Sequence, residues 1–240
     1  MLIGKDFEKV EFDLFGFHLV EPNALIGDTF LFLVSLFLAY RVIRLSVNNP
    51  FSFTWKWFFI IFGISFMAGG LGHSFYNYWG LEGKYASWFL GFFATFLIEW
   101  AMISIHPKTE FAKIFQRIFI MKLLLSILAE TIILSLFDIH ADPSRGLMIP
   151  LVNSTIGLLF ALGYLARVYE KTHAASFKYF WMSVLILIPT TIFQVLKINF
   201  HPLFDRNDAT HVLLFFSLIL YYQAVKGYLV KVKSEDVMKQ

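Results

Sequence analysis

Residues 57–78 read WFFIIFGISFMAGGLGHSFYNY, and this stretch decides the fold class. It contains no Asp, Glu, Lys or Arg, and its first half is apolar on every side. A helix of about 20 such residues is long enough to cross the hydrocarbon layer of a bilayer. A water-exposed helix would instead show one polar face. The stretch therefore predicts a membrane-spanning helix whose polar residues, from His73 onward, gather at one end.

The composition of the whole chain agrees with this prediction. Of the 240 residues, 58% are hydrophobic and only 15% are charged, whereas about a quarter of the residues in a typical soluble domain are charged. Cysteine is absent, which excludes structural disulfides, and the small net charge of +3 argues against a nucleic-acid partner. The frequent Phe, Ile and Lys residues favour a prokaryotic inner membrane as the location.

Six further stretches meet the same criterion of length and apolar character. Turn residues or charges separate them, as at Asn48-Asn49-Pro50 and His106-Pro107. The sequence thus predicts an all-α, seven-transmembrane helix bundle. Its spans are expected at Leu25–Val42, Trp57–Tyr78, Tyr85–Ile105, Ile118–Phe137, Leu147–Arg167, Tyr179–Leu196 and Asp208–Tyr228.

The N-terminal segment precedes the first span and carries several charges, which argues against a cleavable signal peptide. Residues Val10–Glu21 alternate apolar and polar side chains around Phe15-Gly16, a pattern that predicts a short hairpin or interfacial cap. We therefore expect three parts. They are an extracytoplasmic segment over 1–23, a membrane domain over 24–229 and a cytoplasmic tail over 230–240.

The distribution of basic residues predicts the orientation of the bundle. Cytoplasmic loops carry an excess of Lys and Arg. If the N-terminus lies outside, the other 14 of the 20 Lys and Arg residues lie on the cytoplasmic side, and every inner loop agrees. The outer side then holds only Lys5, Lys9, Lys84, Arg145, Lys197 and Arg206.

Polar residues inside the predicted spans are the strongest functional signal. Ionisable groups in a bilayer are costly, so each one suggests a functional site. With the N-terminus outside, five or six spans bring such groups to one depth in the outer half. The inner half offers mainly Glu99, which we expect to pair with Arg44 or Lys122. The outer group comprises Asp28, His73, Tyr76, Asn77, Glu130, Asn153, Gln194, Asn207, Asp208 and His211.

The two histidines of this group leave several interpretations open. Glycines near His73 allow another helix to approach closely, so His73 is expected to face the bundle, as a hydrogen-bonding group, a metal or catalytic residue, or a haem ligand. Asp208 and His211 are three residues apart and can present an oxygen and a nitrogen to one divalent ion. Alternatively, Asp208 or Asn207 caps the last helix.

The two remaining carboxylates differ in depth. Asp28 lies one turn into the first span, where the helix dipole alone would stabilise it. Glu130 lies deeper, in the fourth span, and we expect it to bond a neighbour such as His73 or Asn153.

A histidine late in the second span and another near the start of the seventh form a layout that resembles a known superfamily. This is the seven-helix membrane hydrolase superfamily of alkaline ceramidases and adiponectin-type receptors. The resemblance covers the whole chain as a layout, but its motifs cover only His73 and His211. It implies a zinc ion that activates water for the hydrolysis of lipid amides. Two positions depart from the family pattern, because Asn207 replaces a histidine and Gly69 replaces a serine.

The resemblance therefore implies a variant site. Zinc accepts carboxylate oxygen, and a catalytic site needs only three protein ligands and a water molecule. His73, Asp208 and His211 are the candidate ligands of Zn²⁺, and Asp28, Glu130 and Asp208 are the candidate catalytic carboxylates. The pocket around them would be lined by Tyr76, Asn77, Asn153, Gln194 and Asn207.

The first functional hypothesis is a metal-dependent lipid amide or ester hydrolase whose substrate enters sideways from the membrane. The second is a non-enzymatic protein that binds or senses a lipid or small ligand, with basic inner loops contacting an unidentified protein partner. A transporter subunit and a haem-binding carrier rank lower.

Overall fold

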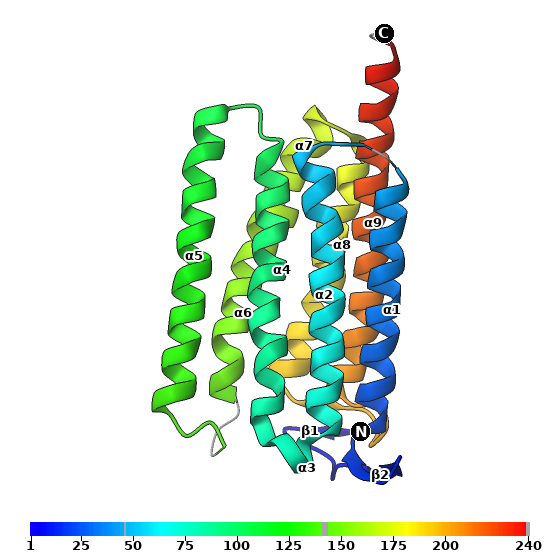
Figure 1. Cartoon of the computed structure of the whole chain (residues 1–240), viewed down its shortest axis with the longest axis vertical. Coiled ribbons are helices and arrows are strands. Elements are labelled where there is room, and N and C mark those ends of the chain that lie inside the picture. Colours follow the sequence, from blue (N-terminus) through cyan, green and yellow to red (C-terminus); the bar gives the residue numbers. More distant parts are fainter. Residues whose placement is uncertain (46, 141–143, 239–240) are drawn as a thin grey trace.

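The computed structural model describes residues 1–45, 47–140 and 144–238. Seven helices in these ranges are long and apolar enough to cross a membrane, which makes the chain a multi-pass integral membrane protein. The helices form one bundle, and the two chain termini lie at its opposite ends (Figure 1).

The spanning helices fall at all seven expected places. Two short elements, α3 (Tyr76–Trp79) and the 3₁₀ turn η1 (Gly80–Lys84), connect α2 to α4, and the fifth span contains a π-helical segment, η2 (Leu159–Leu165), followed by α7 (Ala166–Thr172). A 3₁₀ turn, η3 (Ala175–Phe177), precedes α8. The long helices are α1 (Pro22–Arg44), α2 (Pro50–Ser74), α4 (Tyr85–Ser104), α5 (Thr109–Leu136), α6 (Ser144–Leu158), α8 (Lys178–Val195) and α9 (Arg206–Met238).

Helix ends differ from the sequence prediction where capping decides them. α2 begins at Pro50 because the Asn49 side chain accepts a hydrogen bond from the Ser52 amide at 2.7 Å, and proline fits the first helical position. α9 continues to Met238, so the described residues of the expected tail extend the last helix.

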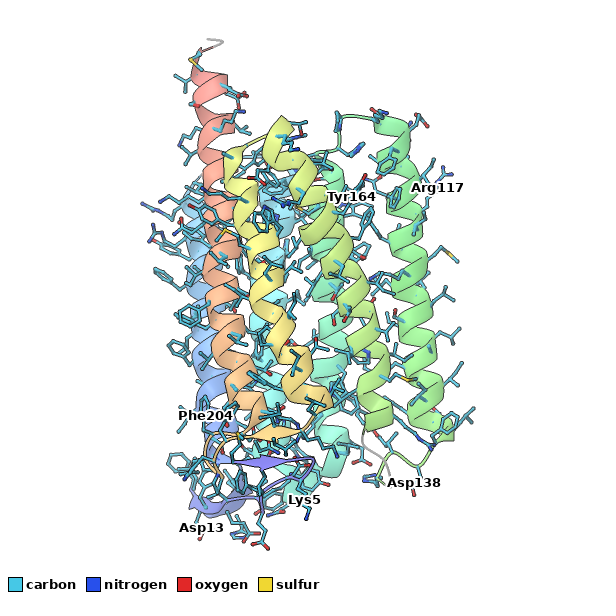
Figure 2. The ribbon with its side chains drawn as sticks, turned by 180° about the vertical axis from the view of Figure 1, so that it is seen from behind. Lys5, Asp13, Arg117, Asp138, Tyr164 and Phe204 are labelled. Atoms are coloured by element: carbon cyan, nitrogen blue, oxygen red, sulfur yellow. The ribbon has the colours of Figure 1, made fainter. Side chains whose placement is uncertain are left out.

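The N-terminal segment forms the hairpin that its alternating pattern predicts. Strands β2 (Glu11–Leu14) and β3 (Phe17–Val20) pair in an antiparallel register. The turn residues Phe15 and Gly16 both have positive φ, 52° and 83°, as a tight two-residue hairpin turn requires. Figure 2 shows Asp13 and Lys5 at the same end of the bundle as Phe204. We call this the hairpin end.

A second strand pair fixes the very start of the chain. β1 (Leu2–Ile3) pairs with β4 (Ile198–Asn199), which lies between α8 and α9. The side-chain amide of Asn199 also donates a hydrogen bond to the Lys5 backbone carbonyl at 2.7 Å. The N-terminal segment is therefore fastened across the hairpin end rather than projecting from it.

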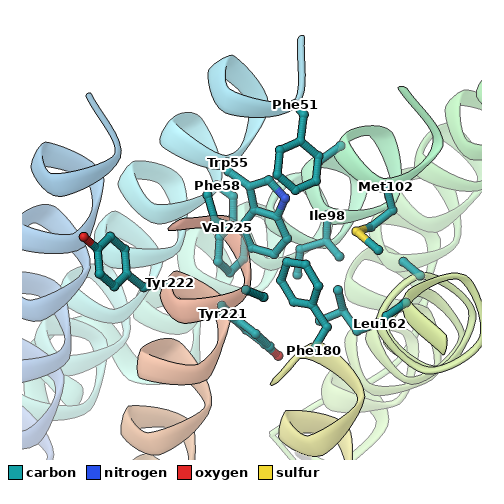
Figure 3. Close-up of a cluster of buried hydrophobic side chains, with 14 of the residues drawn as sticks. Phe51, Trp55, Phe58, Ile98, Met102, Leu162, Phe180, Tyr221, Tyr222 and Val225 are labelled. Atoms are coloured by element: carbon teal, nitrogen blue, oxygen red, sulfur yellow. The ribbon is translucent and has the colours of Figure 1, made fainter. Parts of the chain in front are cut away.

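An aromatic core packs the other half of the bundle. The Trp55 ring of α2 stacks on Phe180 of α8, with centroids 4.9 Å apart, and contacts Tyr221 of α9 (Figure 3). Trp55 and Phe180 are completely buried. This core holds α2, α8 and α9 together. The polar residues of the candidate site lie outside it, at the hairpin end.

Candidate functional site

Two acid–imidazole pairs lie side by side at the hairpin end. The Nδ1 atom of His211 lies 3.3 Å from Oδ1 of Asp28, and His73 Nδ1 lies 2.5 Å from Oε2 of Glu21. The Asp28 side chain is only 3% exposed. The two atoms of the Asp28–His211 pair are close but not aligned for a hydrogen bond, and each is buried without a hydrogen-bond partner.

Small residues place the Asp28–His211 pair. A Cβ atom built on Gly70 of α2 would lie 2.7 Å from Cβ of Asp28, so only glycine lets α1 approach here. Gly27 of α1 faces His211, where an added Cβ would meet Nδ1 at 3.6 Å. The expected close approach of a helix near His73 is thus confirmed, and the approaching helix is α1.

Glu21 is the N-cap residue of α1 and completes the second pair. Burial alone would raise its pKa, but the hydrogen bond from His73 and the charges of His73, Lys9 and Lys84 lower the pKa of Glu21 to about 2. The Lys9 ammonium lies 3.5 Å from the Glu21 carboxylate. The carboxylate is therefore ionised at neutral pH and fixes the Lys9 ammonium and the His73 imidazole.

The start of α9 is capped by Asp205, which corrects the prediction that Asp208 or Asn207 serves as the cap. Oδ1 of Asp205 accepts hydrogen bonds from the amides of Asn207 at 2.6 Å and Asp208 at 3.2 Å. Asp208 instead accepts the side-chain amide of Asn23 at 2.7 Å. This bond joins the starts of α1 and α9.

The other predicted pocket residues of this end have definite partners. Gln194 of α8 donates to Asn207 Oδ1 at 3.0 Å and accepts from the Arg206 guanidinium at 3.2 Å. The Tyr76 ring lies 3.8 Å below the Lys9 ammonium. Asn77 is exposed and donates to the His18 carbonyl at 3.4 Å, so it supports the hairpin rather than the site.

Two cavities adjoin these pairs. The first, which we call the cap pocket, has a volume of about 250 Å³ and lies between the N-terminal segment and the helix ends. Asn23, Tyr76 and Asn207 line it. Its charged and titratable lining residues are Asp6, Glu8, Lys9, Glu21, His73, Lys84, Asp205 and Arg206.

The second cavity, which we call the lateral groove, is larger and mostly apolar. Its volume is about 550 Å³, and α1, α9 and the loop before α9 line it. Ile26 and Phe30 of α1 and Phe216 of α9 are exposed along it, with exposed fractions of 71%, 52% and 51%. Asp208 and His211 also line it, and they bring polar groups to an apolar groove.

Two predicted site residues lie elsewhere, which corrects the expectation that five or six spans converge. Asn153 of α6 accepts hydrogen bonds from Lys122 at 2.9 Å and from Ser126 at 3.2 Å, both on α5. Lys122 also pairs with Glu99 of α4 at 2.8 Å, which confirms one of the two expected partners of Glu99. Figure 1 places α5 at the opposite edge of the bundle from α1.

Glu130 of α5 is on the same side as this second cluster and does not bond His73 or Asn153. It is fully buried, and neither of its carboxylate oxygens has a hydrogen-bond partner. The prediction of a partner for Glu130 was therefore wrong. The sequence predicts a similar depth for Glu130 and His73, but the helices that carry them, α5 and α2, have different neighbours.

The residues present do not fit a zinc ion with three protein ligands. Among the described residues, no group of three or more His, Cys, Asp or Glu side chains is arranged to hold a metal ion. Of the three candidate ligands, His73 is engaged by Glu21, and Asp208 by Asn23 and the Asp205 amide. We therefore derive no chemical step that passes through a metal.

Sequence reasoning missed three residues of the site: Glu21, Asn23 and Lys84. All three lie next to span ends on the membrane side where His73 is predicted. Their position at these span ends was the sequence feature that could have identified them. The alternating pattern of Val10–Glu21 predicts a hairpin or interfacial cap, but it does not indicate which residues the cap covers.

Comparison with known proteins matches the sequence to one protein family. The model of a family of unknown function (DUF6962) matches residues 24–230. No curated protein and no solved structure matches the chain.

Proposed function

The chain belongs to this family of unknown function, DUF6962, and we propose from the geometry of its site that it binds a membrane lipid. The hydrocarbon chain of the lipid lies in the lateral groove between α1 and α9. Its polar part reaches Asp208 and His211, which line the groove. The observation that carries the proposal is an apolar groove that ends at a buried acid–imidazole pair.

Selective lipid binding must depend on the polar residues at the end of the lateral groove. Lipid tails are as apolar as the groove, so an acyl chain gains little by leaving the bilayer for the protein. Selective binding must then come from polar contacts, which are stronger where water is excluded. Asp208 and His211 are the polar residues of α9 that line the groove. Asn23 of α1 also lines it and donates a hydrogen bond to Asp208.

The unpaired atoms at this end support a polar ligand group. Burying a polar atom without a partner costs about 1–3 kcal/mol. Asp28 Oδ1 and His211 Nδ1 are both in that state. A lipid hydroxyl that donates to the His211 imidazole, which lines the groove, would remove part of this cost, and a free acyl chain would not.

A bulky substitution in the groove tests the proposal. Val212→Trp fills the lateral groove, whereas Val152→Trp adds the same ring at a comparably exposed position on α6, away from the groove. Lipids that co-purify with the protein in mild detergent are extracted and identified by mass spectrometry. We expect a lipid at near-equimolar amounts in the parent protein and the control, and its loss in Val212→Trp. Equal lipid content in all three proteins would refute the groove as a binding site.

Lipid hydrolysis is a second candidate, favoured by the Asp28–His211 pair. Asp28 would orient the imidazole of His211, which would take a proton from water as the water attacks the lipid carbonyl. The C–N or C–O bond then breaks, and the leaving amine or alcohol receives that proton. Release of fatty acid from ester and amide lipids, absent in His211→Gln, would support this candidate. Metal content measured on the same preparation tests the zinc hypothesis separately.

The orientation of the bundle decides which leaflet supplies the lipid. We propose that the hairpin end is extracytoplasmic, because most Lys and Arg residues lie toward the other end. Arg117, for example, lies near the end opposite Asp13 (Figure 2). The lateral groove would then draw lipid from the outer leaflet.

A further inference from the structure

We propose that the lipid is anionic and that its charged headgroup binds Lys84 in the cap pocket. This inference rests on the proposed function, because it assigns the other end of the same ligand. A phosphate or carboxylate oxygen of the headgroup would accept hydrogen bonds from the Lys84 ammonium.

Lys84 is the cation of the cap pocket whose charge is not matched. Lys9 and His73 both contact Glu21, and Arg206 pairs with Asp6. Within the described part of the chain, no carboxylate lies within ion-pair distance of Lys84, although its side chain is partly buried. A partly buried ammonium without a counter-ion is costly, and a ligand anion would remove that cost.

The acidic residues of the pocket act on Lys84 only from a distance, because none of those described forms an ion pair with it. Glu21 is held by Lys9 and His73, and Asp205 caps α9. Asp6 is held by Arg206, and Glu8 is exposed. Lys84 is therefore the cation of this pocket whose ammonium is left for the hydrogen bonds of a ligand anion.

The local backbone holds Lys84 against the site. Gly83 of η1 packs on Gly72 of α2 so closely that a Cβ atom on Gly83 would lie 3.1 Å from the Gly72 Cα atom. The connection between α2 and α4 is thereby pressed onto α2, one residue from His73. Lys84 follows Gly83 directly, and its side chain lines the same pocket as His73.

The two cavities share one lining residue. Asn23 lines both the cap pocket and the lateral groove. Its hydrogen bond to Asp208 is the contact between them. A lipid whose tail lies in the lateral groove would place its headgroup beyond Asn23, toward Lys84.

The test compares lipids that share acyl chains and differ in headgroup charge. Full-length protein in detergent is titrated with dioleoyl phosphatidylglycerol or dioleoyl phosphatidylcholine, with the thermal midpoint as the readout, and inorganic phosphate is titrated alone. The variants are Lys84→Gln, Lys84→Arg and, as a control, Lys5→Gln. Lys5 is an exposed lysine of the N-terminal segment, at the same end of the bundle, and it does not line the pocket.

We expect the parent protein to bind the anionic lipid about tenfold more tightly than the zwitterionic one, as one charge-assisted hydrogen bond allows. Lys84→Gln should abolish this preference, and Lys84→Arg and Lys5→Gln should keep it. Equal affinity for both lipids in the parent protein would overturn the inference. So would a preference that survives in Lys84→Gln.

The same titrations separate the two proposals. If Val212→Trp abolishes the binding of both lipids while Lys84→Gln changes nothing, the groove is correct and the headgroup assignment is wrong. If neither lipid binds the parent protein, the proposed function itself fails. Binding of inorganic phosphate with the affinity of the anionic lipid would also overturn the inference, because the site would then serve a soluble anion.

Discussion

At the scale of single residues, Gly70 decides whether α1 can deliver Asp28 to the site. Gly70→Ala would place a methyl group 2.7 Å from Cβ of Asp28, a distance at which the two helices must separate. We expect a loss of about 1–3 kcal/mol in the free energy of unfolding, the usual cost of overpacking. That loss corresponds to about 2–4 °C in melting midpoint for each kcal/mol.

The matched control is Gly91→Ala on α4, where an added Cβ atom meets nothing within 4 Å. Alanine is a better helix former than glycine by about 1 kcal/mol, so this variant should be neutral or slightly more stable. Thermal unfolding of both variants in the same detergent provides the comparison. Equal melting midpoints for Gly70→Ala and Gly91→Ala would contradict the close approach of α1 and α2.

His18 gives the hairpin a pH dependence. Hydrogen bonds to the carboxylates of Asp13 at 3.1 Å and Glu11 at 3.2 Å raise the pKa of His18 above 6.5. Because the pKa is raised on folding, the stabilisation is fully present below pH 6.5 and is lost as pH rises through the folded value. An NMR titration of the imidazole should show the raised pKa, and Asp13→Asn should bring it back toward 6.5. An unshifted value in the parent protein would show that the two contacts are absent in solution.

At the scale of elements, a buried ionic cluster fastens α5 to its neighbours. Lys122 of α5 contacts Glu99 of α4 and Asn153 of α6, and Glu99 is 1% exposed. Lys122→Met leaves the Glu99 charge buried without a partner, which costs about 3–5 kcal/mol in comparable cases. The double variant Lys122→Met/Glu99→Gln removes both charges and should recover much of that loss.

The control for this cluster is Lys113→Met, which breaks an exposed ion pair with Glu110 on the same helix. Exposed pairs contribute about 0–1 kcal/mol, so the melting midpoint should hardly move. If the double variant were as unstable as Lys122→Met alone, the buried pair would not explain the position of α5.

The elements also show what a sequence of this kind can and cannot predict. The spans are predictable because about 20 apolar residues have no other stable place than the bilayer. The rotation of each helix about its axis is not predictable, because a span that is apolar on every side does not show which face packs into the bundle. Predicted depth grouped His73 with Asp28, and the glycines near His73 predicted the close approach of another helix, which is α1. Glu130 and Asn153 face another part of the bundle, and Asn153 shares Lys122 with Glu99, so the predicted depth did not identify their neighbours.

The N-terminal segment shows the same limit in a different way. Its alternation and its Phe15-Gly16 turn predict a hairpin, since these are local features. Its contacts with Asn199 and Arg206 join residues almost 200 positions apart, and no local pattern encodes them. Glu21 and Lys84 were missed for this reason. Their role depends on a cap that only the folded chain brings into place.

At the scale of the whole molecule, the distribution of charge predicts how the bundle lies in the membrane. An odd number of spans puts the two termini on opposite sides, as their places at opposite ends of the bundle require (Figure 1). The positive-inside rule then predicts that the hairpin end lies outside. The absence of cysteine makes this prediction easy to test, because any introduced thiol is the only one in the chain.

Two single-cysteine variants report the orientation. Glu8→Cys lies in the N-terminal segment, and Lys171→Cys lies at the other end of the bundle, near the end of α7; both positions are exposed. In intact cells or spheroplasts, a membrane-impermeant maleimide should label Glu8→Cys and leave Lys171→Cys unlabelled until the membrane is permeabilised. The reverse pattern would place the hairpin end in the cytoplasm. The lateral groove would then draw from the inner leaflet, and the lipid titrations would have to use lipids of that leaflet.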